Sequence, residues 1–127
     1  MGIRIASIIL SLAGVLALIL GLLFWAGLAL NLVAMHMLLG LLAVGALWVI
    51  AVGQVLAGNG SWIITATALI VGALTALIGW THSSLMPGEF HWVIRVVHVA
   101  LGIFMIGLGH MAVARHRRTG AKEMPYS

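Results

Sequence analysis

The order of apolar and polar positions divides the chain into four long apolar stretches separated by short polar breaks. These stretches cover about residues 5–30, 32–56, 62–81 and 90–114. At about 1.5 Å per helical residue, each is long enough to cross the roughly 30 Å hydrocarbon core of a bilayer. Backbone polar groups in lipid must find partners within the protein, so the pattern predicts four transmembrane α-helices.

The breaks between the stretches are short enough to join neighbouring antiparallel helices. Residues 58–61 read Gly-Asn-Gly-Ser, a tight turn in which Ser61 is placed to cap the third helix. Residues 82–89 form a longer polar loop that carries His82 and Glu89. The sequence therefore predicts one domain over residues 1–127, folded as an all-α, up-down-up-down bundle of four transmembrane helices.

Composition excludes a water-soluble domain and several kinds of cofactor. Only 6% of the residues are charged and 64% are hydrophobic, whereas a soluble domain carries about 25% charged residues. An integral membrane protein surrounded by lipid is expected. The chain has no cysteine, which excludes disulfides, thiolate-ligated iron, iron–sulfur clusters and covalent c-type haem.

The net charge of +4 lies mostly in the final segment, residues 115–127, which includes Arg115, Arg117, Arg118 and Lys122. Basic residues beside a transmembrane helix are typical of the cytoplasmic side. We therefore expect a basic cytoplasmic tail and both termini in the cytoplasm of a prokaryotic plasma (inner) membrane. This explanation accounts for the charge without nucleic acid, so no nucleic-acid partner is expected.

Two histidines lie in matching apolar contexts. Residues 35–45 read Met-His-Met-Leu-Leu-Gly-Leu-Leu-Ala-Val-Gly, and residues 97–107 read Val-His-Val-Ala-Leu-Gly-Ile-Phe-Met-Ile-Gly. An imidazole inside a membrane span is costly and usually marks function. The shared spacing raises the expectation of two related helical hairpins, although the first and third stretches show no clear match to one another.

The spacing predicts that His36 and His98 face one another. Their helices run parallel and are diagonal in the bundle, and the two residues lie at similar depths. With neighbouring axes about 8–10 Å apart, the diagonal is on the order of 13 Å, which suits an imidazole–iron–imidazole arrangement. Gly40 and Gly102, one turn further in, leave room for a flat macrocycle. The alternative is that these glycines only allow helices to pack closely.

Arg95 and His91 precede His98 on the same helix. A guanidinium within a span needs an anionic partner or a route to the interface, and Arg95 is expected to bind a haem propionate. The alternative partners are outer headgroups or Glu89. His91 lies on the same helix face as His98, near the surface. Its expected role is to hydrogen-bond a propionate or a quinone-like reductant. The alternative is an ordinary interfacial histidine.

The other histidines carry no comparable prediction. His82 is at the end of a loop, and His116 belongs to the basic tail. His110 is rotated about 120° from His98 and lies about 18 Å further in. The equivalent position in the second stretch is Trp48. A second haem with two histidine ligands is therefore not expected.

This arrangement resembles the four-helix membrane b-type cytochromes. It is most similar to one half of haem A synthase, where histidines near the outer ends of the second and fourth helices face one another. The resemblance spans all four stretches and is carried by His36 and His98 with their glycines. It implies haem ligation. The catalytic half of that family has an acidic residue one turn before the first histidine, where this chain has Leu32 and Val33. Hydroxylating chemistry is not implied.

We expect a haem b-binding membrane protein with two histidine ligands, which transfers electrons rather than catalysing a reaction. Its expected partners are quinol or a redox subunit, and oligomerisation is left open. One alternative is a non-catalytic accessory or pigment-binding subunit of a respiratory or photosynthetic complex, with chlorophyll-type pigment or no cofactor. Another is a transporter that uses His82, His91 and His98, which the absence of carboxylates within the spans disfavours.

Overall fold

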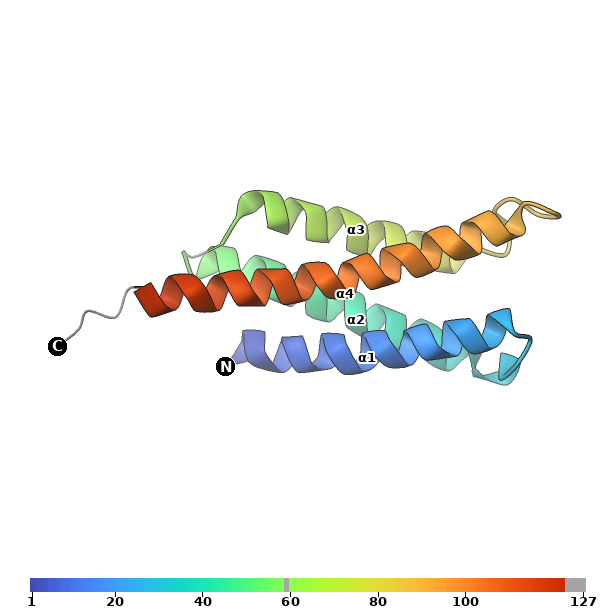
Figure 1. The fold of residues 1–127 in the computed structure, drawn as a ribbon, viewed down its shortest axis with the longest axis horizontal. Helices are drawn as coiled ribbons and strands as arrows, with labels where there is room; N and C mark the ends of the chain where they lie inside the picture. The colour runs from blue at the N-terminus through green and yellow to red at the C-terminus, as the bar shows by residue number, and fades with distance from the viewer. Residues whose placement is uncertain (59, 123–127) are drawn as a thin grey trace.

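A computed structural model describes residues 1–58 and 60–122, in which four helices are long and apolar enough to cross a membrane. They are α1 (Gly2–Trp25), α2 (Val33–Leu56), α3 (Trp62–Thr81) and α4 (His91–Lys122), with a short 3₁₀ helix at Leu30–Leu32 before α2 (Figure 1). No strand occurs in the part of the chain described. The predicted all-α bundle is confirmed, and the chain is an integral membrane protein by helix length and composition. Asn59 of the predicted turn and residues 123–127 of the predicted tail lie outside the described residues.

The observed helix boundaries differ from the prediction at two places. The first helix ends at Trp25 rather than near residue 30, because Gly27 and Ala29 adopt left-handed backbone conformations with φ of 75° and 55°. The fourth helix continues past residue 114, through the basic residues. The predicted cap at Ser61 is present, since its hydroxyl accepts a hydrogen bond of 3.5 Å from the backbone N–H of Ile64.

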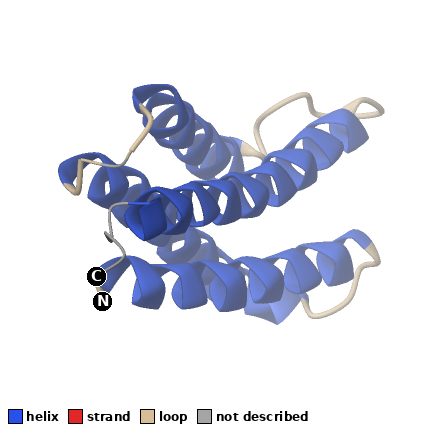
Figure 2. Cartoon of the chain, turned by 60° about the vertical axis from the view of Figure 1, so that its left-hand side comes forward, coloured by secondary structure: helices blue, strands red, loops and turns tan. Residues whose placement is uncertain are grey.

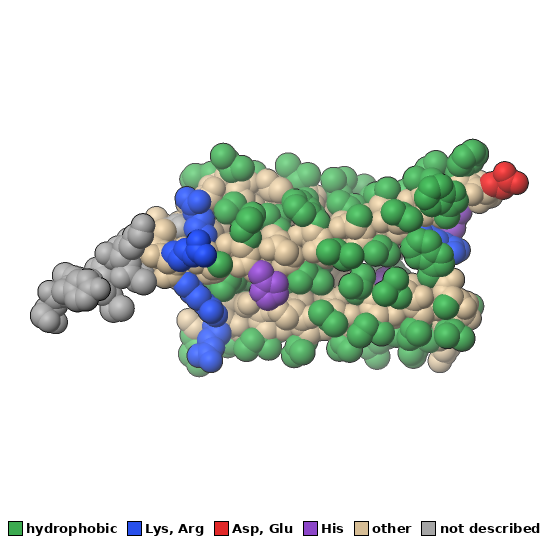
Figure 3. All heavy atoms as spheres, in the orientation of Figure 1, with side chains coloured by type: hydrophobic (Ala, Val, Ile, Leu, Met, Phe, Trp, Pro, Cys, Tyr) green, Lys and Arg blue, Asp and Glu red, His purple; other side chains and the backbone are tan. Residues whose placement is uncertain are grey.

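The four helices form a ring with α2 and α4 on its short diagonal. Each of α1 and α3 packs against both α2 and α4, and α2 also contacts α4 across the centre. The start of α1 and the end of α4 lie at one end of the bundle (Figures 1 and 2). The α1–α2 and α3–α4 connections lie at the other end. Most Lys and Arg side chains gather at the terminal end (Figure 3). The loop end therefore holds the start of α2 and of α4, where the two predicted ligands are found.

Many of the side chains buried between the helices are small, although Leu10, Leu47 and Ile50 are buried as well. Ala43 and Leu47 on α2 are fully buried, and Met105 on α4 is 3% exposed. The core also contains several other alanines, namely Ala6, Ala13, Ala46, Ala51, Ala68 and Ala112. Alanine lets helix backbones approach closely in a membrane, where packing rather than the hydrophobic effect drives association. Green hydrophobic side chains cover the visible outer surface (Figure 3).

The two hairpins are related by an internal near-two-fold arrangement. A side chain at Gly14 of α1 would lie 2.9 Å from Ile106 of α4. One at Gly72 of α3 would lie 3.2 Å from Val44 of α2 and would also collide with Trp48, a contact without a counterpart at Gly14. Val44 and Ile106 each follow their motif histidine by eight positions. Equivalent residues thus make equivalent contacts, which relates α1 to α3 as well as α2 to α4.

Close helix contact at Gly109 generates a stability prediction. A side chain there would collide with Leu10 and lie 3.4 Å from Leu47, and both leucines are fully buried. Gly109→Val should therefore lower the free energy of unfolding by about 1–3 kcal/mol, measured by denaturation in detergent. Gly107→Val is the matched control, since no atom lies within 4 Å of its added Cβ. Equal stability of the two variants would contradict the close packing of α1, α2 and α4 at this level.

Candidate functional site

A cavity of about 330 Å³ opens between the four helices at the loop end of the bundle. Its volume falls in the range of about 300–1,000 Å³ that is usual for small-molecule and cofactor pockets. Every helix contributes small residues to its walls: Gly14, Ala17 and Gly21 from α1, Gly40 and Ala43 from α2, Ala76 and Gly79 from α3, and Gly102 from α4. The cavity exists because these positions lack bulky side chains where the helices diverge.

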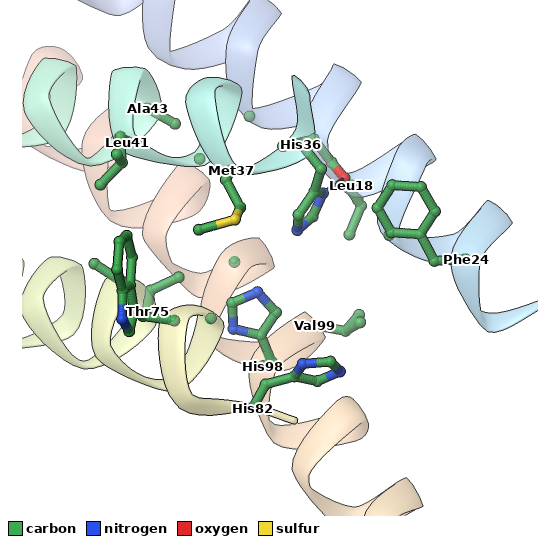
Figure 4. Close-up of a pocket in the computed structure, with 18 of the residues that line it drawn as sticks. Leu18, Phe24, His36, Met37, Leu41, Ala43, Thr75, His82, His98 and Val99 are labelled. Carbon is green, nitrogen blue, oxygen red and sulfur yellow. Dashed lines mark hydrogen bonds between the residues drawn. The ribbon is translucent and has the colours of Figure 1, made fainter. Parts of the chain in front are cut away.

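His36 and His98 face one another across this cavity. Figure 4 shows the two rings pointing toward each other, and their centres are 6.2 Å apart with the ring planes at 60°. A metal bound by an imidazole nitrogen at about 2 Å lies about 3 Å from the ring centre, so imidazoles on opposite sides of one metal have centres about 6 Å apart. The pair is therefore spaced for a single metal between two rings.

A hydrogen bond and an aromatic contact orient the ring of His36. Its Nδ1 lies 2.9 Å from the backbone carbonyl oxygen of Ala17 on α1. Because a carbonyl only accepts, Nδ1 carries the proton and donates, which leaves the Nε2 lone pair free. The ring of Phe24 packs edge-on against His36 at 5.4 Å. Such an outer hydrogen bond is the usual way in which a metal-ligating histidine is fixed.

The ring of His98 is held against α3 but lacks the equivalent hydrogen bond. A side chain at Gly79 would lie 3.0 Å from Cε1 of His98, just as one at Gly21 would lie 3.3 Å from Cε1 of His36. Within the described residues, Nδ1 of His98 is buried and has no hydrogen-bond partner. A buried, unpaired ring nitrogen is costly in an apolar surrounding.

Basic side chains lie at the loop end of the cavity. Arg95 and His82 line it, and the ring of His91 packs 5.0 Å from that of His82. Nδ1 of His91 lies 3.2 Å from the carbonyl oxygen of Leu85, to which it donates. Partial burial lowers the pKa of His82, and the nearby His91, Arg95 and His36 lower it further. A neutral His82 next to Arg95 offers hydrogen bonds to a carboxylate or a hydroxyl group.

Most of the predicted site residues come together. His36, His98, Arg95, Gly40 and Gly102 all line the cavity. A side chain at Gly40 or Gly102 would meet no atom within 4 Å, so these glycines border open space rather than a helix contact. His91, also predicted to bind the cofactor, is not among the residues that line the cavity, and its ring packs against that of His82.

Sequence reasoning missed the contributions of His82 and Met37. Both line the cavity, and Figure 4 shows the Met37 thioether on the same side of α2 as His36, beside the two histidines. Nothing in the spacing distinguishes Met37 from a packing residue. From the sequence, His82 is only a histidine close to the loop. The position of its ring depends on the path of that loop, which the sequence pattern does not predict.

His110 lies apart from the cavity, as its predicted face requires. It is exposed on the outer surface, and its Nε2 is 3.2 Å from the Ser11 hydroxyl oxygen of α1. Among the residues that the structure describes, no group of three or more His, Cys, Asp or Glu is close enough to hold a metal ion. Any metal between His36 and His98 therefore needs further ligands that these side chains do not supply.

Comparison of the chain with known protein families, with curated proteins and with solved structures finds no match in any of the three.

Proposed function

We propose that this chain is a membrane cytochrome b with one haem, held by His36 and His98 as the two axial ligands. The observation that carries the proposal is the pair of facing rings, 6.2 Å apart, inside a cavity walled by small residues of all four helices. Two imidazoles alone make an incomplete metal site, whereas a macrocycle brings four nitrogens of its own. The donor set thus suits haem better than a bare ion.

The chain's own residues would hold the group in three ways. The free Nε2 of His36 would supply one ligand to the iron, and His98 on the diagonal helix, whose ring centre is 6.2 Å from that of His36, would supply the other. Gly40 and Gly102 border the open space beside each ring. Gly21 of α1 and Gly79 of α3 leave room for the two imidazole rings themselves, since an added Cβ would lie 3.3 Å from Cε1 of His36 and 3.0 Å from Cε1 of His98.

The basic loop end of the cavity is where we place the haem propionates. Arg95 and His82 line this end, and His91 supports His82 from behind. Guanidinium groups suit carboxylates because they offer paired N–H donors in a plane. The opposite, inner part of the cavity is lined by apolar side chains such as Val44 and Met105, which suit the apolar edge of the macrocycle.

With both His36 and His98 as ligands, haem would supply one-electron transfer rather than oxygen activation. The cluster of Lys and Arg at the terminal end supports cytoplasmic termini in a prokaryotic plasma membrane, so the cavity opens toward the outer face. Quinol or a redox subunit approaching at that end would be the electron-transfer partner. Oligomerisation through the apolar outer faces is compatible with this arrangement.

A non-catalytic accessory or pigment-binding subunit is the alternative function. The 6.2 Å spacing does not favour a separate chlorophyll-type pigment on each histidine, since two macrocycles do not fit between the rings. The absorption spectrum of the purified protein distinguishes the two functions. A sharp reduced alpha band is expected for a six-coordinate haem, a red-shifted band for chlorophyll, and no visible band for a subunit without a cofactor.

Removal of either proposed ligand should abolish the low-spin haem spectrum. His36→Ala and His98→Ala each delete one axial nitrogen, so the haem should become five-coordinate, loosely held or absent. Spectra and haem-to-protein ratios of purified variants are the measurement. His110→Ala is the matched control, because this histidine is exposed and bonded to Ser11. Low-spin haem retained in both ligand variants would show that the pairing is wrong.

The cavity itself gives a second test that leaves both ligands in place. Gly102→Leu adds an isobutyl group beside His98, where the structure has open space, and should exclude the macrocycle while the apoprotein remains folded. Haem content and circular dichroism are measured together. A folded Gly102→Leu protein with full haem content would contradict this position of the macrocycle.

Arg95 should influence the redox potential. A cation favours the reduced form, so Arg95→Gln should lower the midpoint potential or weaken haem retention. Redox titration against the Arg95→Lys variant separates the effect of charge from that of geometry. An unchanged midpoint potential and an unchanged haem content in Arg95→Gln would show that Arg95 does not bind a haem propionate.

A further inference from the structure

A row of polar residues follows the packing of α1 against α4, from the middle of the bundle to its terminal end. On each helix the positions recur at intervals of three or four, which puts them on one helix face. A side chain at Gly14 would lie 2.9 Å from Ile106, so the two faces meet. This α1–α4 seam consists of Arg4, Ser7, Ser11 and Gly14 on α1, and of Ile106, His110, Val113 and Arg117 on α4.

A second contact shows which residues of the seam lie at the same level. The Ser11 hydroxyl oxygen lies 3.2 Å from Nε2 of His110. Because α1 and α4 are antiparallel, seven residues back from Ser11 and seven residues forward from His110 lead in the same direction, about 10.5 Å along each axis. These steps reach Arg4 and Arg117, both of which are exposed. The seam therefore ends in two arginines at one level, one on each helix.

The two arginines have no acidic side chain beside them in the part of the chain that the structure describes. Of the two acidic residues, Glu89 lies in the loop at the opposite end, and Glu123 lies outside the described residues. Figure 3 shows Lys and Arg side chains in a band across the terminal end and an acidic side chain at the other end. Two guanidinium groups at one level repel one another, and an anion between them removes this repulsion.

Hydrogen-bonding groups continue from the arginines into the hydrocarbon region. Ser7 lies about 4.5 Å further in than Arg4 on the same face and is partly exposed. The Ser11 hydroxyl donates to the carbonyl of Ser7 at 2.9 Å, so Nε2–H of His110 is the donor to the Ser11 oxygen. A phospholipid has its groups in the same order, with the phosphate outermost, the ester carbonyls next and the acyl chains innermost. Ser7 lies at the level of the esters.

We propose that the terminal end of the α1–α4 seam binds an anionic phospholipid, with the phosphate between Arg4 and Arg117 and an ester carbonyl at the Ser7 hydroxyl. Guanidinium groups offer paired N–H donors that match phosphate oxygens. An anionic lipid fits better than a zwitterionic one, because the ammonium group of a zwitterionic headgroup would lie among the arginines. The cytoplasmic leaflet supplies such lipids to basic residues beside a membrane span. This site lies apart from the cavity and does not depend on haem.

The test measures which lipids associate with the full chain in phosphatidylcholine vesicles. The vesicles carry a trace of spin-labelled phosphatidylglycerol or of spin-labelled phosphatidylcholine, and electron spin resonance gives the fraction of each that the protein immobilises. One basic residue near an anionic surface contributes about a fivefold factor, so phosphatidylglycerol should be preferred about fivefold or more. The double variant Arg4→Gln and Arg117→Gln should lose this preference, and Ser7→Ala should reduce it.

The matched control removes the same charge from the same end of the bundle. Arg115 and Arg118 are exposed but lie on other faces of α4, so Arg115→Gln with Arg118→Gln should keep most of the preference. Circular dichroism should show unchanged helix content in both double variants. An equal loss of preference in the two would reveal only a general attraction of the basic end to anionic membranes and would overturn the site. Displacement of the labelled lipid by excess soluble glycerol phosphate would also overturn it.

Discussion

The site depends on the cost of placing imidazole nitrogens in an apolar bundle. Each ring has one nitrogen that donates and one that accepts, and neither finds water within a membrane span. Helix carbonyls are the one polar group that every span offers, but ordinary side chains cover them. Gly21 removes that cover, so the ring of His36 reaches the Ala17 carbonyl at 2.9 Å. The proton is thereby fixed on Nδ1, and the free lone pair points into the cavity.

Glycine has two opposite effects in this bundle: at some positions it allows close helix contact, and at others it leaves open space. The positions of these glycines explain where the helices touch and where the cavity lies. At Gly14, Gly72 and Gly109, an added Cβ would collide with or press upon side chains of a neighbouring helix, so these positions bring the helices together. At Gly40 and Gly102 an added Cβ meets nothing within 4 Å. Gly72 and Gly109 lie away from the cavity, and Gly14 lies both at a helix contact and in the cavity wall. Gly40 and Gly102 border the open space of the cavity at the loop end.

The sequence predicted the four helices, the diagonal pairing and the two facing histidines, because hydrophobic length and helical periodicity determine these features directly. It did not predict the contributions of α1 and α3. Every residue has a backbone carbonyl, so the residue type does not show which carbonyl accepts a hydrogen bond. The role of the Ala17 carbonyl therefore cannot be predicted from an apolar run. The place of His82 depends on the path of the loop after α3. The repeat between α1 and α3 consists of two glycines and a leucine in each helix. In α1 these are Gly14, Leu16 and Gly21, and in α3 they are Gly72, Leu74 and Gly79. So short a match indicates a repeat only when the contacts of the glycines are known.

The near-two-fold arrangement is broken at the loop end, and the difference gives the cavity a polar and an apolar side. Phe24 follows Gly21 by three positions, as His82 follows Gly79. The first hairpin thus places a phenyl ring against His36, whereas the second places an imidazole beside His91 and near Arg95. A ligand with symmetrical edges would gain nothing from this difference. Haem has carboxylates on one edge only, so the proposed site would bind it in one orientation, with the carboxylates toward the second hairpin.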